Sequence, residues 1–475
     1  MRLLTAISFI ILIASCAGKQ KKEVEVIPEI TRDWEEIKAD SVLTILAENS
    51  PASYFIYRGR NMGYEYELLY EFTKDKNIRL QVQMVNDLDE MFSHLDSCYG
   101  DVIACNLTIT EERSQVIDYT VPHLTTRQVL IQRKPEDFRK LSKQEQKDTL
   151  IGEIEELQGK TIHVWQNSSY FKQITLLNDQ LALNMEIIAT DGDLITAELI
   201  RMVSDGEIDY TIADENVAKI DLRYYSNLDI SLKLSGEDSI AFGIRKTSPA
   251  LRDSLNAWLI AKENQSTIGE VKRKYFKRKN LSNKANQDYS SLNGDVLSPY
   301  DEIIKSESDK IGWDWRLTSA IIYQESKFET WKVSWAGAFG IFQFMPATAA
   351  GYGITPESSA EAQIKAGIKK LNKNFQQWLE IIPDSSECVK FTLATFNAGR
   401  AHVDDARALC NVYDLDDTIW EDNVSDMIRN LSKPTYYRDK VVKHGYCRGI
   451  ETYEYVIEVI QRYEEYKAAF PTPDA

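Results

Sequence analysis

Glu325 occupies a position where a carboxylate is costly. It lies in the stretch SAIIYQESKFETWKVSWAGAFGIFQFMP, and a spacing of four, four and three residues relates Leu317, Ile321, Glu325 and Phe328. If the segment is helical, these residues lie on one apolar stripe. Burial disfavours an ionised carboxylate and raises its pKa toward neutrality. A carboxyl group that gives up one proton and then takes one back is suited to general acid–base catalysis.

Further polar residues could build a cleft around this acid. Gly337 and Gly340 in the following loop permit tight turns and a close approach of the backbone to a ligand, and Gln343 follows them. Asn397 ends another apolar run, and Tyr455 lies on an expected helix. Taken singly, Asn397 could cap a helix, Gln343 could face solvent and Tyr455 could belong to the core. Together they favour a binding cleft.

The ordered set of these motifs resembles the Slt-type lytic transglycosylase domain, which has a goose-lysozyme-like fold. The resemblance covers roughly residues 299 to 465 and rests on Gln324-Glu325-Ser326-x-Phe328, Gly337-Ala-Phe-Gly340-Ile-Phe-Gln343-Phe-Met345-Pro346, Phe396-Asn397-Ala-Gly399 and Glu451-Thr452-x-x-Tyr455-Val456. It implies that Glu325 is the only catalytic carboxylate. The substrate-binding residues that it implies are Ser326, Gln343, Met345, Asn397 and Tyr455. The family usually has a tyrosine where Phe396 stands, so any hydrogen bond from that hydroxyl must come from elsewhere, with Tyr455 the first candidate.

Most glycosidases use a second carboxylate as nucleophile or as a base for water, and this sequence offers no obvious one. The resemblance implies a reaction that needs none. Glu325 protonates the glycosidic oxygen that leaves when the β-1,4 bond between N-acetylmuramic acid (MurNAc) and N-acetylglucosamine (GlcNAc) breaks. It then accepts a proton from the C6 hydroxyl of MurNAc, which closes a 1,6-anhydro ring. The expected function is a peptidoglycan lytic transglycosylase that acts on glycan strands without a metal or cofactor. A hydrolytic muramidase and a non-catalytic small-molecule receptor or wall-binding scaffold remain alternatives.

The first half of the chain alternates short apolar strands with helices, which indicates an α/β domain over residues 41–276. The segment GDVIACNLTITEERSQVIDYTVPH resembles the signature of family 3 periplasmic solute-binding proteins, whose two lobes close on a ligand. The resemblance implies that Thr108 and Arg113 hold a ligand carboxylate and that Asp214 holds an α-ammonium group. The expected ligand is an amino acid or a muropeptide. The alternative is that Arg113 is a surface residue and the cleft has lost its ligand.

The expected organisation is therefore two-domain: an α/β bilobed periplasmic-binding-protein-like domain, then a mainly α goose-lysozyme-like domain. We expect a signal peptide over residues 1–16, a charged tether over 17–40, a polar linker over 277–298 and the transglycosylase domain over 299–475. The linker is rich in Asn, Ser, Lys and Asp. Beyond it, the apolar periodicity is nearly all helical.

The first residues, MRLLTAISFIILIASC, predict export, and their end resembles a bacterial lipobox. Cys16 would then carry lipid and anchor the chain at the periplasmic face of the outer membrane. A net charge of −17 argues against nucleic acid as a partner. Among the remaining cysteines, a Cys98–Cys105 disulfide and small buried thiols are both compatible with the spacing.

Overall fold

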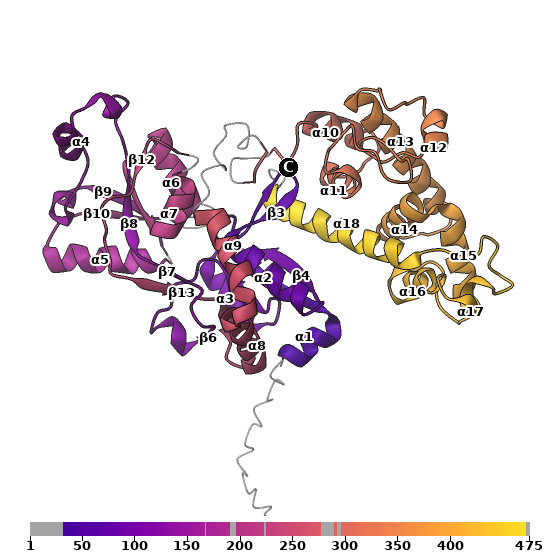
Figure 1. The fold of residues 1–475 in the computed structure, drawn as a ribbon, viewed down its shortest axis with the longest axis horizontal. Coiled ribbons are helices and arrows are strands. Elements are labelled where there is room, and N and C mark those ends of the chain that lie inside the picture. The colour runs from indigo at the N-terminus through magenta and orange to yellow at the C-terminus, as the bar shows by residue number, and fades with distance from the viewer. Residues whose placement is uncertain are drawn as a thin grey trace, which may run out of the picture.

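The computed structural model describes residues 32–166, 168–190, 196–222, 225–276, 289–291 and 296–471. Cys16 and most of the predicted tether and linker lie outside these residues. The described chain folds into an α/β half with two lobes and a helical half, drawn from indigo to magenta and from orange to yellow in Figure 1. The predicted fold class is confirmed.

The first lobe contains a five-stranded sheet in the order β4-β1-β5-β14-β6. Its strands and the adjacent β2–β3 hairpin are β1 (Val42–Ala47), β2 (Phe55–Tyr57), β3 (Arg60–Met62), β4 (Arg79–Met84), β5 (Val102–Ala104), β6 (Ile117–Tyr119) and β14 (Gly243–Arg245). Its helices are α1 (Trp34–Asp40), α2 (Tyr64–Asp75), α3 (Leu88–Asp96), η1 (Arg113–Gln115), α8 (Pro249–Ile260), η4 (Lys262–Asn264) and α9 (Gln265–Phe276). Strand β1 is parallel to β4 and β5, and its residues are mostly buried, as in a sheet covered on both faces.

The second lobe contains another five-stranded sheet, in the order β10-β9-β11-β8-β12. Its strands are β8 (Gln128–Arg133), β9 (Thr161–Trp165), β10 (Glu186–Thr190), β11 (Tyr210–Asp214) and β12 (Leu228–Asp229). Its helices are η2 (Phe138–Lys140), α4 (Lys143–Thr149), η3 (Ile154–Leu157), α5 (Ser169–Leu181), α6 (Thr196–Asp205) and α7 (Glu215–Asp221). The antiparallel pair β7 (Leu124–Thr126) and β13 (Asp238–Ile240) connects the lobes, because β7 leads into the second lobe and β13 leads back.

The second half is helical. Its elements are α10 (Asp301–Asp309), α11 (Trp315–Ser326), α12 (Pro346–Gly351), α13 (Ala360–Leu379), α14 (Ser385–Ala398), α15 (Arg400–Cys410), η7 (Trp420–Val424), α16 (Ser425–Asn430), α17 (Pro434–Tyr437) and α18 (Gly449–Ala469). Helix α18 packs against α11, α14 and α16, and it buries Tyr455, Val456, Val459 and Tyr466. In Figure 1 it runs from the helical half to the β2–β3 hairpin of the α/β half. One helix thus touches both halves.

Residues 34–40 lie in the stretch predicted as a tether, yet they form α1. Asp33 caps this helix, Ile37 is fully buried, and Arg32 Nε donates to Asp101 Oδ1 at 2.8 Å. A seven-residue helix with one buried apolar residue shows no periodicity, so the sequence pattern gave no sign of it. Within the predicted linker, the described residues 289–291 pack on β2, where Ser291 N donates to Ile56 O at 2.9 Å.

The described cysteines form no disulfide, so Cys98 and Cys105 are not bridged. Cys105, Cys388, Cys410 and Cys447 are buried. Burial raises the pKa of the Cys105 thiol well above its ordinary value. Of the two possibilities that the spacing left open, these cysteines behave as small apolar residues.

Candidate active site and ligand cleft

Helix α11 delivers Glu325 to the surface of the helical half. Asp314 caps its first turn by accepting a hydrogen bond from Arg316 N at 2.9 Å. Leu317 and Ile321 are buried on the stripe that leads to Glu325, as predicted. Phe328 does not belong to that stripe. The helix ends at Ser326, and Lys327 and Phe328 have left-handed φ values of 56° and 65°, which turn the chain away from the helix axis.

The Glu325 carboxyl is half-buried and has one hydroxyl partner and two cationic neighbours. Tyr455 Oη, from α18, donates to Glu325 Oε1 at 2.7 Å. Burial raises the pKa of Glu325 to about 7, while the Tyr455 hydrogen bond and the charges of Lys370 and Lys332 oppose that rise. Near neutral pH, Glu325 is therefore divided between its acid and its base form.

Lys370 fills the space beside the acid. It projects from α13, and burial lowers the pKa of its ammonium while Glu325 raises it. Its Nζ lies 3.8 Å from the centroid of the Phe396 ring, within the range of a cation–π interaction. Phe396 therefore supports the lysine that faces Glu325. The hydroxyl that the family tyrosine would bring is absent at this position, and Tyr455 supplies one to Glu325.

The loop after α11 folds back onto the acid. Ser326 is fully buried, and its Oγ donates to Ile341 O at 2.8 Å, which fixes the loop against the end of α11. Gln343 has a φ of 48°, and its Nε2 donates to Gly340 O and Lys332 O at 2.8 and 3.0 Å. Met345 is exposed. Ser326 and Gln343 thus shape the loop, and Met345 is the predicted groove residue that faces solvent.

Asn397 is linked to the same region by a hydrogen bond with α18. Its Oδ1 accepts from Thr452 Oγ1 at 2.8 Å, and Thr452 lies one turn before Tyr455. Asn397 itself is exposed at the end of α14. The structure therefore brings the last turn of α14, the first turns of α18 and the end of α11 together, as the motif order predicts.

Two residues of this site, Lys370 and Lys332, were not predicted from the sequence motifs. Lys370 could have been found by the argument that found Glu325, because it follows Ala366 and Gly367 by four and three residues on a buried helical face. Lys332 could not. Its Nζ donates to Glu325 O at 2.7 Å only because the loop turns back after Phe328.

The predicted ligand residues of the first half meet where the two lobes face each other. Asp214 ends β11 in the second lobe, and its Oδ2 accepts from Nδ2 of Asn106 in the first lobe at 2.7 Å. Thr108 Oγ1 accepts across the same gap from Ser169 Oγ at 3.3 Å. Arg113 lies on η1 and donates to Thr108 O at 3.1 Å. Thr108, Arg113 and Asp214 therefore lie together where the two lobes meet.

Glu48 lies near Asp214, whose pKa its charge raises, and it was not singled out by the sequence. It follows β1 directly, at the carboxyl end of a parallel strand, where open α/β sheets place their ligands. Burial raises the pKa of Glu48 to about 7 and that of Asp214 to about 8. Glu48 Oε2 and Asp214 Oδ1 are buried without a hydrogen-bond partner. These two buried carboxyl oxygens can therefore each accept a hydrogen bond from a ligand.

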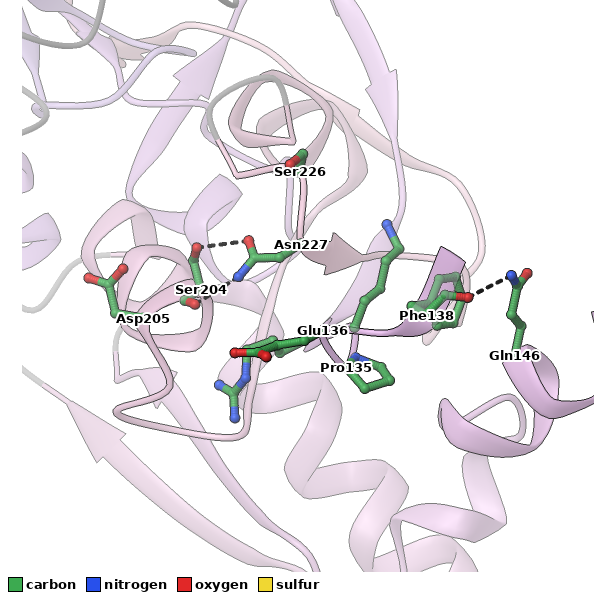
Figure 2. Close-up of a pocket in the computed structure, with 10 residues that line it drawn as sticks. Pro135, Glu136, Phe138, Gln146, Ser204, Asp205, Ser226 and Asn227 are labelled. Carbon is green, nitrogen blue, oxygen red and sulfur yellow. Dashed lines mark hydrogen bonds between the residues drawn. The ribbon is translucent and has the colours of Figure 1, made fainter. Parts of the chain in front are cut away.

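A further hollow of about 990 Å³ lies in the second lobe, among the ends of β8 and α6 and the start of β12 (Figure 2). Its polar groups already bond to one another: Asn227 Nδ2 donates to Ser204 O at 2.8 Å, and Gln146 Nε2 donates to Phe138 O at 2.8 Å. No predicted site residue lines it. This hollow is therefore separate from the residues that the sequence singled out.

Comparison with known proteins agrees with this division. Residues 42–278 match the bacterial extracellular solute-binding proteins, family 3, and residues 302–417 match the transglycosylase SLT domain. The first half thus forms a family 3 solute-binding domain, and the second half contains an SLT domain. These matches define the class: the chain is a lytic transglycosylase with a solute-binding-protein-like N-terminal domain.

Similar proteins with one shared name span almost the whole chain. The membrane-bound lytic murein transglycosylase F of Desulfosudis oleivorans is 28% identical over 432 residues, which cover 90% of each chain. The protein of the same name from Ectopseudomonas mendocina is 27% identical over 468 residues, covering 97% of this chain and 90% of the relative. Among solved structures, a mutant of ArgBP from T. maritima is 22% identical with a TM-score of 0.43, covering 51% of this chain and 99% of its own.

Proposed function

We propose that this chain cleaves the MurNAc–GlcNAc β-1,4 bond of peptidoglycan with Glu325 as its single acid–base catalyst and releases 1,6-anhydro-MurNAc ends. The observation that carries the proposal is the environment of that carboxyl. Its pKa of about 7 allows it to hold a proton before bond cleavage and to accept one afterwards at a single pH.

The first step is protonation of the leaving glycosidic oxygen. Tyr455 holds Oε1 of Glu325, and we assign proton transfer to Oε2. As the proton leaves, negative charge develops on the carboxylate. Lys332 and Lys370 favour that charge, because both lower the pKa of Glu325 from the value that burial alone would give. Substrate contacts would come from the groove residues Met345 and Asn397.

The second step is attack by the C6 hydroxyl of MurNAc on its own anomeric carbon. The Glu325 carboxylate takes the hydroxyl proton, the C6 oxygen bonds to C1, and the 1,6-anhydro ring closes. Both charged groups that shift the pKa of Glu325 are lysines. A hydrolase of the usual type would need a second carboxylate beside the sugar. This charge pattern favours internal attack over the muramidase alternative.

Activity of Glu325→Gln on purified peptidoglycan tests the proposal. The amide keeps the size of the side chain but carries no transferable proton, so turnover should fall by at least ~10²–10⁴-fold. Glu458→Gln is the matched control. Glu458 is an exposed acid on α18 that accepts a hydrogen bond from Gln324, the neighbour of Glu325. Glu458→Gln should stay close to wild type. A Glu325→Gln turnover within threefold of wild type would reject Glu325 as the catalyst.

For the solute-binding domain we infer a small zwitterionic ligand, an amino acid or a short wall-derived peptide. Arg113 and Thr108 would hold its carboxylate, since a guanidinium binds a carboxylate through two parallel hydrogen bonds. Asp214 and Glu48 would accept from its ammonium group through their open buried oxygens. The domain then serves as the sensor of an attached enzyme.

Contacts between the two halves support a coupling of ligand binding to cleavage. Tyr466 Oη and Arg462 Nη1 donate to Gly59 O at 3.0 and 3.3 Å, which ties α18 to the β2–β3 hairpin. Tyr323, two residues before Glu325, also packs on Gly59: a Cβ added there would lie 2.5 Å from the tyrosine ring. A ligand changes this contact only if it binds one arrangement of the lobes more tightly than another. Cleavage rates with and without a bound ligand measure that difference.

Membrane attachment through lipid at Cys16 is the last part of the proposal. Two observations support it: the lipobox-like sequence IASC, and the name shared by the relatives, membrane-bound lytic murein transglycosylase F. Within the described residues, no helix combines the length and apolarity that a bilayer span requires. Cys16→Ala should abolish fatty-acid labelling and release the chain from the membrane fraction. Fractionation of the wild type with inner-membrane markers would overturn the outer-membrane assignment.

A further inference from the structure

The loop between Glu325 and Met345 turns an apolar face to solvent. Trp331, Val333 and Trp335 are 75%, 65% and 94% exposed, whereas Lys332 and Ser334 between them are partly buried. This alternation is the period of a strand, and Val333 pairs with Phe339 in an antiparallel bridge. In an ordinary surface strand the apolar side faces the core. Here the apolar side chains face solvent, which is typical of an interaction surface.

The inward side of the same loop is tied to the candidate acid. Lys332 Nζ donates to Glu325 O at 2.7 Å, and Lys332 O accepts from Gly340 N at 2.9 Å and from Gln343 Nε2 at 3.0 Å. Ser334 N donates to Ala338 O at 2.8 Å. These bonds fix the backbone on which the two tryptophans stand. The backbone that carries the exposed indoles is therefore fixed to the end of α11, next to Glu325 in the chain fold.

The geometry points to Trp331 and Trp335 as stacking platforms for pyranose rings, which extend the glycan groove beyond the bond that is cut. This inference rests on the proposed function. Indole presents a large flat apolar face with little rotamer entropy to lose, and the C–H faces of a sugar ring are apolar while its rim is polar. Two platforms separated by Val333 suit a polymeric strand better than a single disaccharide. Their role would be to bind and orient the strand.

A membrane surface is the other environment that favours exposed tryptophan. Attachment to Glu325 argues for the glycan. A loop that is bonded to the backbone of the acid and inserted into lipid would bring the acid itself against the bilayer, where glycan strands do not run. The exposed Met345, another predicted groove residue, lies on the same loop and is 48% exposed. The apolar face and Met345 are thus carried by one folded-back loop, in which Phe339 pairs with both Val333 and Phe344.

Binding in a chain that cannot cut its ligand tests this inference. All variants carry Glu325→Gln, which prevents turnover, and Cys16→Ala, so that no lipid at that residue tethers the chain to vesicles. The probes are peptide-free glycan strands and vesicles of phosphatidylethanolamine with phosphatidylglycerol. Trp331→Ala and Trp335→Ala should each weaken strand binding about tenfold. Trp335→Phe, which keeps a flat ring, should weaken it by about threefold or less. Tyr99→Ala is the control, since Tyr99 is 67% exposed on the other half of the chain.

Strands should also shield the indoles. Acrylamide quenching of tryptophan fluorescence should therefore fall when strands are added to the parent, which carries only Glu325→Gln and Cys16→Ala, and it should change less in a variant that combines Trp331→Ala with Trp335→Ala. If the parent binds strands and the Trp→Ala variants bind equally well, the platforms are wrong and the proposed function stands. Loss of vesicle binding in the Trp→Ala variants with unchanged strand binding would overturn the inference in favour of a membrane contact. If the parent binds no strands at all, the peptidoglycan assignment itself fails.

Discussion

Glu325 and Asp214 are both buried enough to raise their pKa values, yet their surroundings differ. Glu325 is half-buried, accepts a hydrogen bond from Tyr455 and lies near two lysines. The loop that follows it has several solvent-exposed residues. Asp214 is fully buried between two lobes, and one of its oxygens has no partner. A raised carboxyl pKa alone thus does not indicate catalysis. We therefore base the different roles proposed for Glu325 and Asp214 on the groups around each carboxyl, and not on the pKa alone.

Arg113→Ala is the change with the largest expected effect on the ligand cleft. Arg113 is half-buried. If the bound ligand buries the pair of its carboxylate with Arg113, the loss of that pair should weaken ligand binding by on the order of 2–5 kcal/mol. Cleavage of peptidoglycan in the absence of ligand should be unchanged. Calorimetry against a panel of amino acids and muropeptides measures the effect, with Arg273→Ala, an exposed arginine of α9, as the control. No heat from any panel member with the wild-type chain would leave this domain a scaffold.

Tyr455→Phe should lower kcat/KM about tenfold, because the hydroxyl bonds to the carboxylate that forms in the reaction. It should also change the pH profile. The Tyr455 hydrogen bond lowers the pKa of Glu325, so its loss raises that pKa, and the fall of activity at alkaline pH should move to higher pH. Tyr463→Phe is the matched control, since its hydroxyl, on the same helix, donates to Asp314. An unchanged pH profile in Tyr455→Phe would remove this tyrosine from the account.

Glu325→Gln should change stability in a pH-dependent way. Between pH 4.5, the ordinary pKa, and about pH 7, the folded chain holds a proton that the unfolded chain has lost. Wild-type stability therefore falls as pH rises through this window, and glutamine has no such loss. The free energy of unfolding of the variant minus that of wild type should therefore be larger at pH 8 than at pH 4, by up to roughly 3 kcal/mol. Denaturant unfolding at both pH values measures this, and an equal difference at both would mean that the carboxyl is not desolvated.

The sequence predicted which residues of the candidate active site lie together more completely than it did for the residues between the lobes, and the reason is physical. Glu325, Asn397 and Tyr455 lie on helices, whose period of 3.6 residues places side chains on known faces. Asn106 meets Asp214 only because the two lobes come together, which no local period records. Glu48 could have been suspected only from its place after a parallel strand. Lys332 and the outward face of Trp331 and Trp335 likewise depend on how a loop turns after Phe328.

The mass of the muropeptides released from purified peptidoglycan tests the central claim most directly. If a single carboxyl drives internal attack by the C6 hydroxyl, the wild-type chain should release products with 1,6-anhydro-MurNAc ends, each one water lighter than the hydrolysis product of the same composition. Digestion in ¹⁸O-labelled water should leave those ends unlabelled. Products that carry only reducing ends, with ¹⁸O at C1, would contradict the account and show that water is the nucleophile.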